Sequence, residues 1–106
     1  MSKLILDLKE VIETLSTYNI EHTRFPHNYL AEVGYEVPIV RGMAIDDKKL
    51  ILLDKEQGKE EMRQTVIHEL IHTVHFRRGD LRSGIERIVQ KETRSVYKHL
   101  YGVYPL

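Results

Sequence analysis

The segment 59–76 constrains the fold most strongly, because its apolar residues are spaced as in a helix while its histidines gather on a separate face. One broad arc of the helical wheel holds Met62, Val66, Ile67, Leu70, Ile71 and Val74. A second arc holds His68, His72 and His75. Gly79 follows, and glycine commonly ends a helix. The pattern predicts a helix over 59–76 with one side in a core and another beside a cleft.

His68 and His72 are four residues apart, with Glu69 between them, which spells the HExxH motif. On a helix both imidazoles lie on one face, about one turn apart, and can bind a single tetrahedral Zn²⁺. Zinc lowers the pKa of a bound water, so we expect Glu69 to act as general base and then to protonate the leaving amine. The alternative is two polar surface histidines on an amphipathic helix.

A catalytic zinc site usually has three protein ligands and one water. His75 is the nearest further donor, but it stands seven residues after His68, an axial span of about 10.5 Å at 1.5 Å per residue. Ligand bonds of about 2 Å cannot easily close that distance. We therefore expect His75 to line the cleft rather than to bind the metal.

The third donor is predicted downstream, in the segment 84–100. An apolar stripe runs along this segment through Ile85, Val89, Val96 and Leu100. Glu92 falls on the stripe, where an uncompensated carboxylate is costly to bury and a metal would offset that cost. A carboxylate paired with Arg or Lys is the alternative. Glu86 falls off the stripe and is interpreted as a surface charge, so the predicted ligands of one Zn²⁺ per chain are His68, His72 and Glu92.

Stabilising the oxyanion of a tetrahedral intermediate takes one donor besides the metal. His75, Tyr97 and Tyr101 are candidates for this role or for lining the cleft, and His99 and Tyr104 stay open as alternatives. Residues of these types more often pack or face solvent than act in catalysis.

The stretch Glu92-Thr93-Arg94-Ser95-Val96-Tyr97 carries a resemblance to a known family. It occupies the place of the Glu-Ala-Asn-x-Phe-Ala-like stretch that follows HExxH in the gluzincin-like ImmA/IrrE-type metallopeptidases of bacteria and their phages. The residues that agree are Glu92 and Val96, and the similarity covers about 41–100. The resemblance implies a minimal zincin-like fold, a zinc-dependent endopeptidase, and Glu92 as third ligand. It also implies a regulatory substrate such as a helix-turn-helix repressor.

The remaining pattern predicts a single α+β domain over 1–106. Apolar spacing indicates an N-terminal helix ending near 18–19, and 18–38 is irregular with one short strand at most. Segments 37–45 and 49–53 flank a turn at 46–48 and predict a small antiparallel hairpin. A last helix over 83–101 would carry the third ligand. In zincins such a sheet borders the cleft, and its edge strand can pair with an extended peptide.

Composition narrows the class of protein. The chain has 106 residues, 42% of them apolar, and no cysteine, so one domain without disulfides is expected. No signal peptide or membrane span stands out, and we expect a cytoplasmic protein. Basic residues outnumber acidic ones seven to three in 77–106, yet no nucleic-acid motif accompanies them, and nucleic acid is not an expected partner. The oligomeric state stays open.

Two other functions remain as alternatives. A regulatory or binding module could keep the metallopeptidase fold while cleaving weakly or not at all. A zinc hydrolase acting on a small amide is the other, and a narrow closed cavity would favour it over a peptidase.

Overall fold

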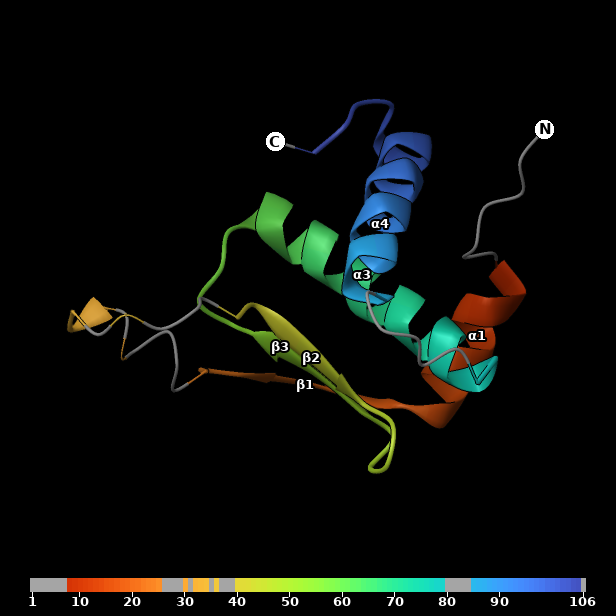
Figure 1. Cartoon of the computed structure of the whole chain (residues 1–106), viewed down its shortest axis with the longest axis horizontal. Coiled ribbons are helices and arrows are strands. Elements are labelled where there is room, and N and C mark those ends of the chain that lie inside the picture. The colour runs from red at the N-terminus through yellow and green to blue at the C-terminus, as the bar shows by residue number, and fades with distance from the viewer. Residues whose placement is uncertain are drawn as a thin grey trace.

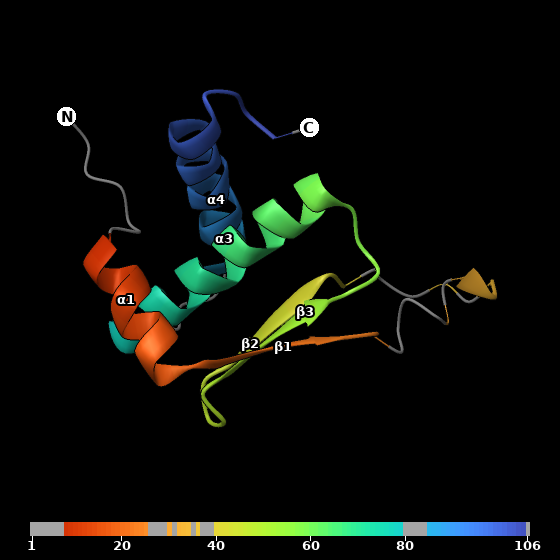
Figure 2. The ribbon, with the colours of Figure 1, turned by 180° about the vertical axis from the view of Figure 1, so that it is seen from behind.

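The computed structural model describes residues 8–25, 30, 32–34, 36, 40–79 and 85–105. Its helices are α1 (Leu8–Thr17), α3 (Lys59–Arg77) and α4 (Ile85–Tyr101), and its strands are β1 (Asn19–Thr23), β2 (Gly42–Ile45) and β3 (Leu50–Asp54). The predicted α+β class is confirmed. In Figures 1 and 2 the sheet lies on one side of α3, and α4 rises from the other.

The sheet has the strand order β1-β3-β2. Strands β2 and β3 form the predicted antiparallel hairpin, in which Gly42 faces Leu53 and Ile45 faces Leu50. Residues 37–39, predicted as part of its first strand, lie outside the described residues. β1 is the one short strand expected in 18–38, and it runs parallel to β3. β1 therefore occupies the edge of β3 that the hairpin leaves open. Because this pairing is parallel, the sheet is mixed rather than purely antiparallel.

Two apolar clusters flank α3. Alternation along β3 turns Ile51 and Leu53 inward, each 2% exposed, to pack with Tyr18 and with Leu70 of α3. The second cluster joins α3 to α4 and consists of Ile67, Ile71, Val89, Val96 and Tyr97. Because both clusters share α3, this helix fixes the position of the sheet relative to α4.

The helix boundaries agree closely with the expected ones. α3 ends at Arg77, followed by Gly79 in a left-handed conformation at φ 72°, which glycine adopts without strain. α1 ends at Thr17, and the buried hydroxyls of Thr14 and Thr73 hydrogen-bond across the α1–α3 contact at 3.1 Å. Residues 83–84 of the predicted last helix and the start of the predicted first helix lie outside the described residues. Among the helices described, none has the length and apolar character needed to cross a membrane.

Candidate metal centre

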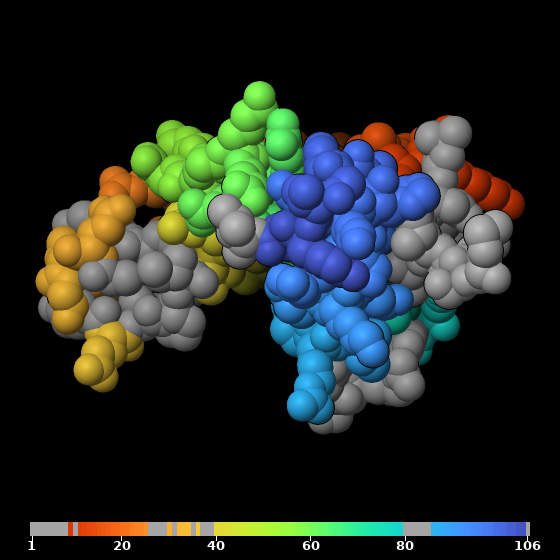
Figure 3. All heavy atoms as spheres, turned by 90° about the horizontal axis from the view of Figure 1, so that it is seen from above, coloured from red at the N-terminus to blue at the C-terminus, as the bar shows by residue number. Residues whose placement is uncertain are grey.

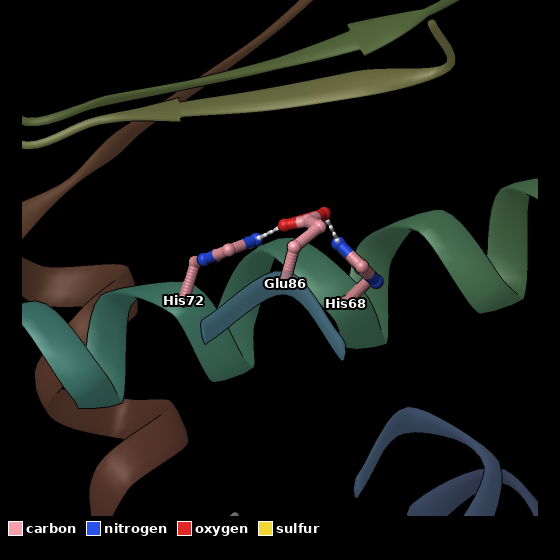
Figure 4. A group of neighbouring side chains, drawn as sticks. All are labelled: His68, His72 and Glu86. Atoms are coloured by element: carbon pink, nitrogen blue, oxygen red, sulfur yellow. Dashed lines mark hydrogen bonds and ion pairs between the residues drawn. The ribbon is translucent and has the colours of Figure 1, made fainter. Parts of the chain in front are cut away.

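Two histidines of α3 and one glutamate of α4 form a compact group. Nε2 of His68 lies 2.6 Å from Oε1 of Glu86, and Nε2 of His72 lies 2.7 Å from Oε2 of the same carboxylate. Figure 4 shows both imidazoles turned toward Glu86 from neighbouring turns of α3. One ligand atom from each residue lies within 4.8 Å of the other two. Two imidazole nitrogens and a carboxylate oxygen are the donor set of many catalytic zinc sites, so the residues present fit Zn²⁺.

Gln90 stands one turn after Glu86 on α4 and contacts the far side of the first histidine. Its Oε1 lies 3.2 Å from Nδ1 of His68. An imidazole that gives its Nε2 lone pair to a metal carries its proton on Nδ1, so His68 in that form would donate to Gln90. Such a contact orients the ring of a metal-binding histidine and makes it a stronger ligand.

The pKa values of the group favour the protonation states that metal binding needs. Burial lowers the pKa of His72, assisted by the nearby His68 and His75, and this outweighs the opposing effect of Glu86. Burial acts to raise the pKa of Glu86, but the hydrogen bonds and charges of His68 and His72 outweigh it and the pKa is lowered. A neutral His72 beside an ionised Glu86 is the state in which both can bind a cation.

Glu69 stands between His68 and His72 in the sequence. It is buried, with only 5% of its surface exposed. Burial, and secondarily the charge of Glu86, raise the pKa of Glu69 to about 8. The backbone of β2 passes very close at Gly42. A Cβ at that position would lie 2.9 Å from Oε2 of Glu69 and 2.5 Å from Cγ2 of Thr65, so the approach requires a glycine.

The group opens into a cleft of about 550 Å³ between the sheet and the start of α4. Its walls are Val40, Arg41 and Gly42 on the sheet side, Glu61, Gln64, Thr65, His68 and Glu69 on α3, and Glu86, Gln90 and Thr93 on α4. Arg41 is held at the rim by Asp54 at 3.2 Å and Glu61 at 3.3 Å. The cleft is therefore open and mainly polar, with Glu69 inside it.

The carboxylate predicted as third ligand lies elsewhere. Oε1 of Glu92 is 2.8 Å from Nε2 of His75, and Glu92 does not join the group of His68 and His72. The cost of placing a carboxylate on the apolar side of α4 is offset by this imidazole rather than by a metal. Glu86, expected to be only a surface charge, has a side chain that is 67% exposed, yet it contacts both His68 and His72.

The three residues expected at the oxyanion or along the cleft do not line it. His75 is 4% exposed and packs beneath α4, and Tyr97 is 3% exposed within the α3–α4 core. Tyr101 is 43% exposed, and its ring lies tilted against that of Tyr97 with the ring centroids 4.6 Å apart. Apolar packing and the pair with Glu92 account for their positions. The alternatives His99 and Tyr104 are exposed and also lie outside the cleft lining.

Three residues of the site were missed from sequence: Glu86, Gln90 and Gly42. The first two carried a usable signal, because Glu86, Gln90 and Thr93 follow one another at steps of four and three on one polar face of α4. Gly42 carried none, since its role depends on how closely β2 approaches α3.

Comparisons with protein-family models, curated proteins and solved structures find no match to the chain. Similarity to the ImmA/IrrE-type metallopeptidases stays a prediction from the residues themselves.

Proposed function

We propose that the chain is a zinc-dependent peptidase in which His68, His72 and Glu86 bind the metal and Glu69 is the general base. One observation carries the proposal: the donor atoms of these three ligands converge within 4.8 Å at the edge of a cleft that also contains Glu69. A structural zinc site normally has four protein ligands, whereas three ligands beside an open cleft leave a position for reactants.

Zinc held by His68, His72 and Glu86 would lower the pKa of a water toward neutrality and polarise a carbonyl. Glu69 supplies the proton transfers. Its buried carboxyl holds a proton more readily than an exposed one, as the raised pKa of about 8 expresses, so it can accept a proton from water and pass it to the leaving amine. With a cation bound nearby, the pKa of Glu69 would fall and Glu69 would be ionised near neutral pH.

A peptide is the substrate class that the cleft favours. Strand β2 stands at one edge of the sheet described, paired with β3 alone, and Gly42 at its start lines the cleft. An extended chain can pair with such an edge through backbone hydrogen bonds. The open, polar cleft suits this arrangement better than a small amide, for which a closed cavity is expected. The repressor-type substrate stays a prediction of the family resemblance.

Metal content and hydrolysis of a quenched fluorescent peptide library test the proposal together. Purified protein should bind about one zinc per chain, and a chelator should abolish hydrolysis until zinc is restored. Glu69→Gln should keep the zinc and lose hydrolysis by a factor on the order of 10² to 10⁴. The exposed Glu21 of β1 offers the matched control, because Glu21→Gln should change neither quantity.

Two results would contradict the proposal. Hydrolysis that survives in Glu69→Gln would exclude Glu69 as the base. Zinc bound without hydrolysis of any library member would favour the regulatory or binding module instead.

A further inference from the structure

A second depression lies on the face of α3 opposite the cleft. Cleft residues on α3 include Gln64 and His68, whereas this groove is lined by positions half a turn away, among them Met62 and Val66. Val11 of α1 forms one wall of the groove, and Leu100 and Tyr101 of α4 form another. Its volume is about 670 Å³.

The groove leaves apolar side chains in contact with solvent. Leu100 is 59% exposed and Tyr101 43%, and on the neighbouring α1 Ile12 and Leu15 are 55% and 54% exposed. Seen from above in Figure 3, the end of α4 and residues 102–105 form a raised surface over α3. Exposed apolar side chains on α1 and α4, near a groove lined mainly by apolar residues, are typical of a site that binds another molecule.

Two cationic side chains make the groove positively charged. Lys59 and Arg63 both line it, one turn apart on α3, and no acidic side chain is among its lining residues. Neither cation forms an ion pair with any residue in the part of the chain that the structure describes. Arg63 instead lies over the ring of Tyr101, 4.8 Å from its centroid, which holds the guanidinium at the rim. The groove therefore complements an apolar surface flanked by negative charge.

The walls also determine the conformation of the partner. Helices α1, α3 and α4 satisfy their backbone groups internally, so the groove offers no strand edge to an extended chain. A helix satisfies its own backbone and needs only side-chain contacts, which this groove supplies. Lys59 and Arg63 are separated by about 6 Å along α3, and acidic residues four positions apart on a docked helix have the same spacing.

We propose that this groove docks an amphipathic helix of a partner protein, with its apolar face against α3 and acidic residues opposite Lys59 and Arg63. The surface is separate from the candidate metal centre, and its occupancy does not depend on zinc.

The test uses a fluorescein-labelled synthetic peptide, stapled to hold a helix, with leucines on one face and glutamates beside them. One matched peptide has lysine in place of glutamate, and another has serine in place of leucine. Fluorescence anisotropy at low salt should show that the acidic peptide binds, that both matched peptides bind much more weakly, and that added salt weakens binding.

Charge reversal identifies the surface. Lys59→Glu combined with Arg63→Glu should weaken binding of the acidic peptide about tenfold and strengthen binding of the lysine peptide. Stronger binding of the lysine peptide would show that the variant is folded and that the charge of its groove is reversed, because a protein that has failed to fold would not gain affinity for either peptide. Lys48→Glu, in the exposed turn before β3, should leave both affinities unchanged.

Three outcomes would overturn the proposal. The first is equal binding of the acidic and lysine peptides, or binding that charge reversal leaves unchanged. The second is self-association in analytical ultracentrifugation that the same reversal abolishes, which would assign the groove to a second copy. The third is peptide binding that appears only after residues 1–7 are removed, which would assign it to the chain's own N-terminal segment.

Discussion

His68 and Gln90 form the contact that orients the candidate metal centre: Nδ1 of the histidine lies 3.2 Å from Oε1 of the glutamine, and Nε2 is turned toward Glu86. Removing the acceptor should free the ring to rotate. We expect Gln90→Leu to weaken zinc binding by about 10- to 100-fold, the usual effect of losing a partner of a metal ligand. Competition against a chromophoric chelator measures this, and Gln90→Glu, which keeps an acceptor, is the matched variant. Unchanged affinity in Gln90→Leu would show that the contact does not support the site.

Glu86 and Glu92 can be distinguished by paired substitutions. Glu86→Ala removes a ligand proposed from the structure and should weaken zinc binding by more than about 100-fold, beyond the loss expected for a partner of a ligand. Glu92→Ala should keep the zinc but destabilise the protein by about 1–3 kcal/mol, because the buried His75 loses a hydrogen-bonding partner. Zinc titration and denaturant unfolding report the two effects. The reverse pattern would restore Glu92 as the ligand expected from sequence.

The contrast between these two glutamates shows where sequence reasoning succeeds. Helix periodicity correctly predicted α3, and His68 and His72 share a face as their spacing indicates, because those features are local to the chain. His75, expected to line the cleft with them, is buried instead. The cost of burying Glu92 was also correctly identified. The partner that offsets this cost was not predicted, because the side chain that contacts Glu92 depends on how α4 crosses α3. The parallel pairing of β1 with β3 is likewise a long-range property that no local pattern specifies.

Glu69 gives the metal-free protein a distinctive pH dependence. Its pKa is raised from 4.5 to about 8 on folding, so the folded chain holds a proton that the unfolded chain releases. The stability from this group is complete below pH 4.5 and is lost as pH rises toward 8. Glu69→Gln removes the effect, so its stability relative to wild type should increase by up to about 1.4 kcal/mol per pH unit across that window.

Denaturant unfolding at several pH values, with zinc removed by chelation, measures the difference between the two proteins. Taking the difference largely removes the contributions of His72 and Glu86, whose pKa values are lowered. Zinc should flatten the wild-type dependence, because a nearby cation lowers the pKa of Glu69. A difference that does not change with pH would mean that Glu69 is not buried as a protonated acid.

Gly42 links the sheet to Glu69, the proposed general base. A methyl group there would meet Thr65 at 2.5 Å, so Gly42→Ala must push β2 away from α3. We expect a loss of about 1–3 kcal/mol in unfolding free energy, together with reduced hydrolysis because Glu69 moves with its contact. Met43, 42% exposed on the same strand, provides the control, and Met43→Ala should cost less than about 0.5 kcal/mol. Wild-type stability in Gly42→Ala would show that β2 does not approach α3 so closely.

The partly buried pair of His75 and Glu92 helps to fix the register of α4 on α3. The same two helices meet again where Glu86 contacts His72, so α4 meets α3 at two carboxylate–imidazole contacts along its length. Sliding α4 by one turn, about 5.4 Å, would break both contacts at once. The position of Glu86 along α3, and with it the contact to His68 and His72, therefore depends partly on the His75–Glu92 pair, which lies outside the cleft. A substitution at His75 should consequently lower the unfolding free energy, as we expect of Glu92→Ala, while the zinc stays bound.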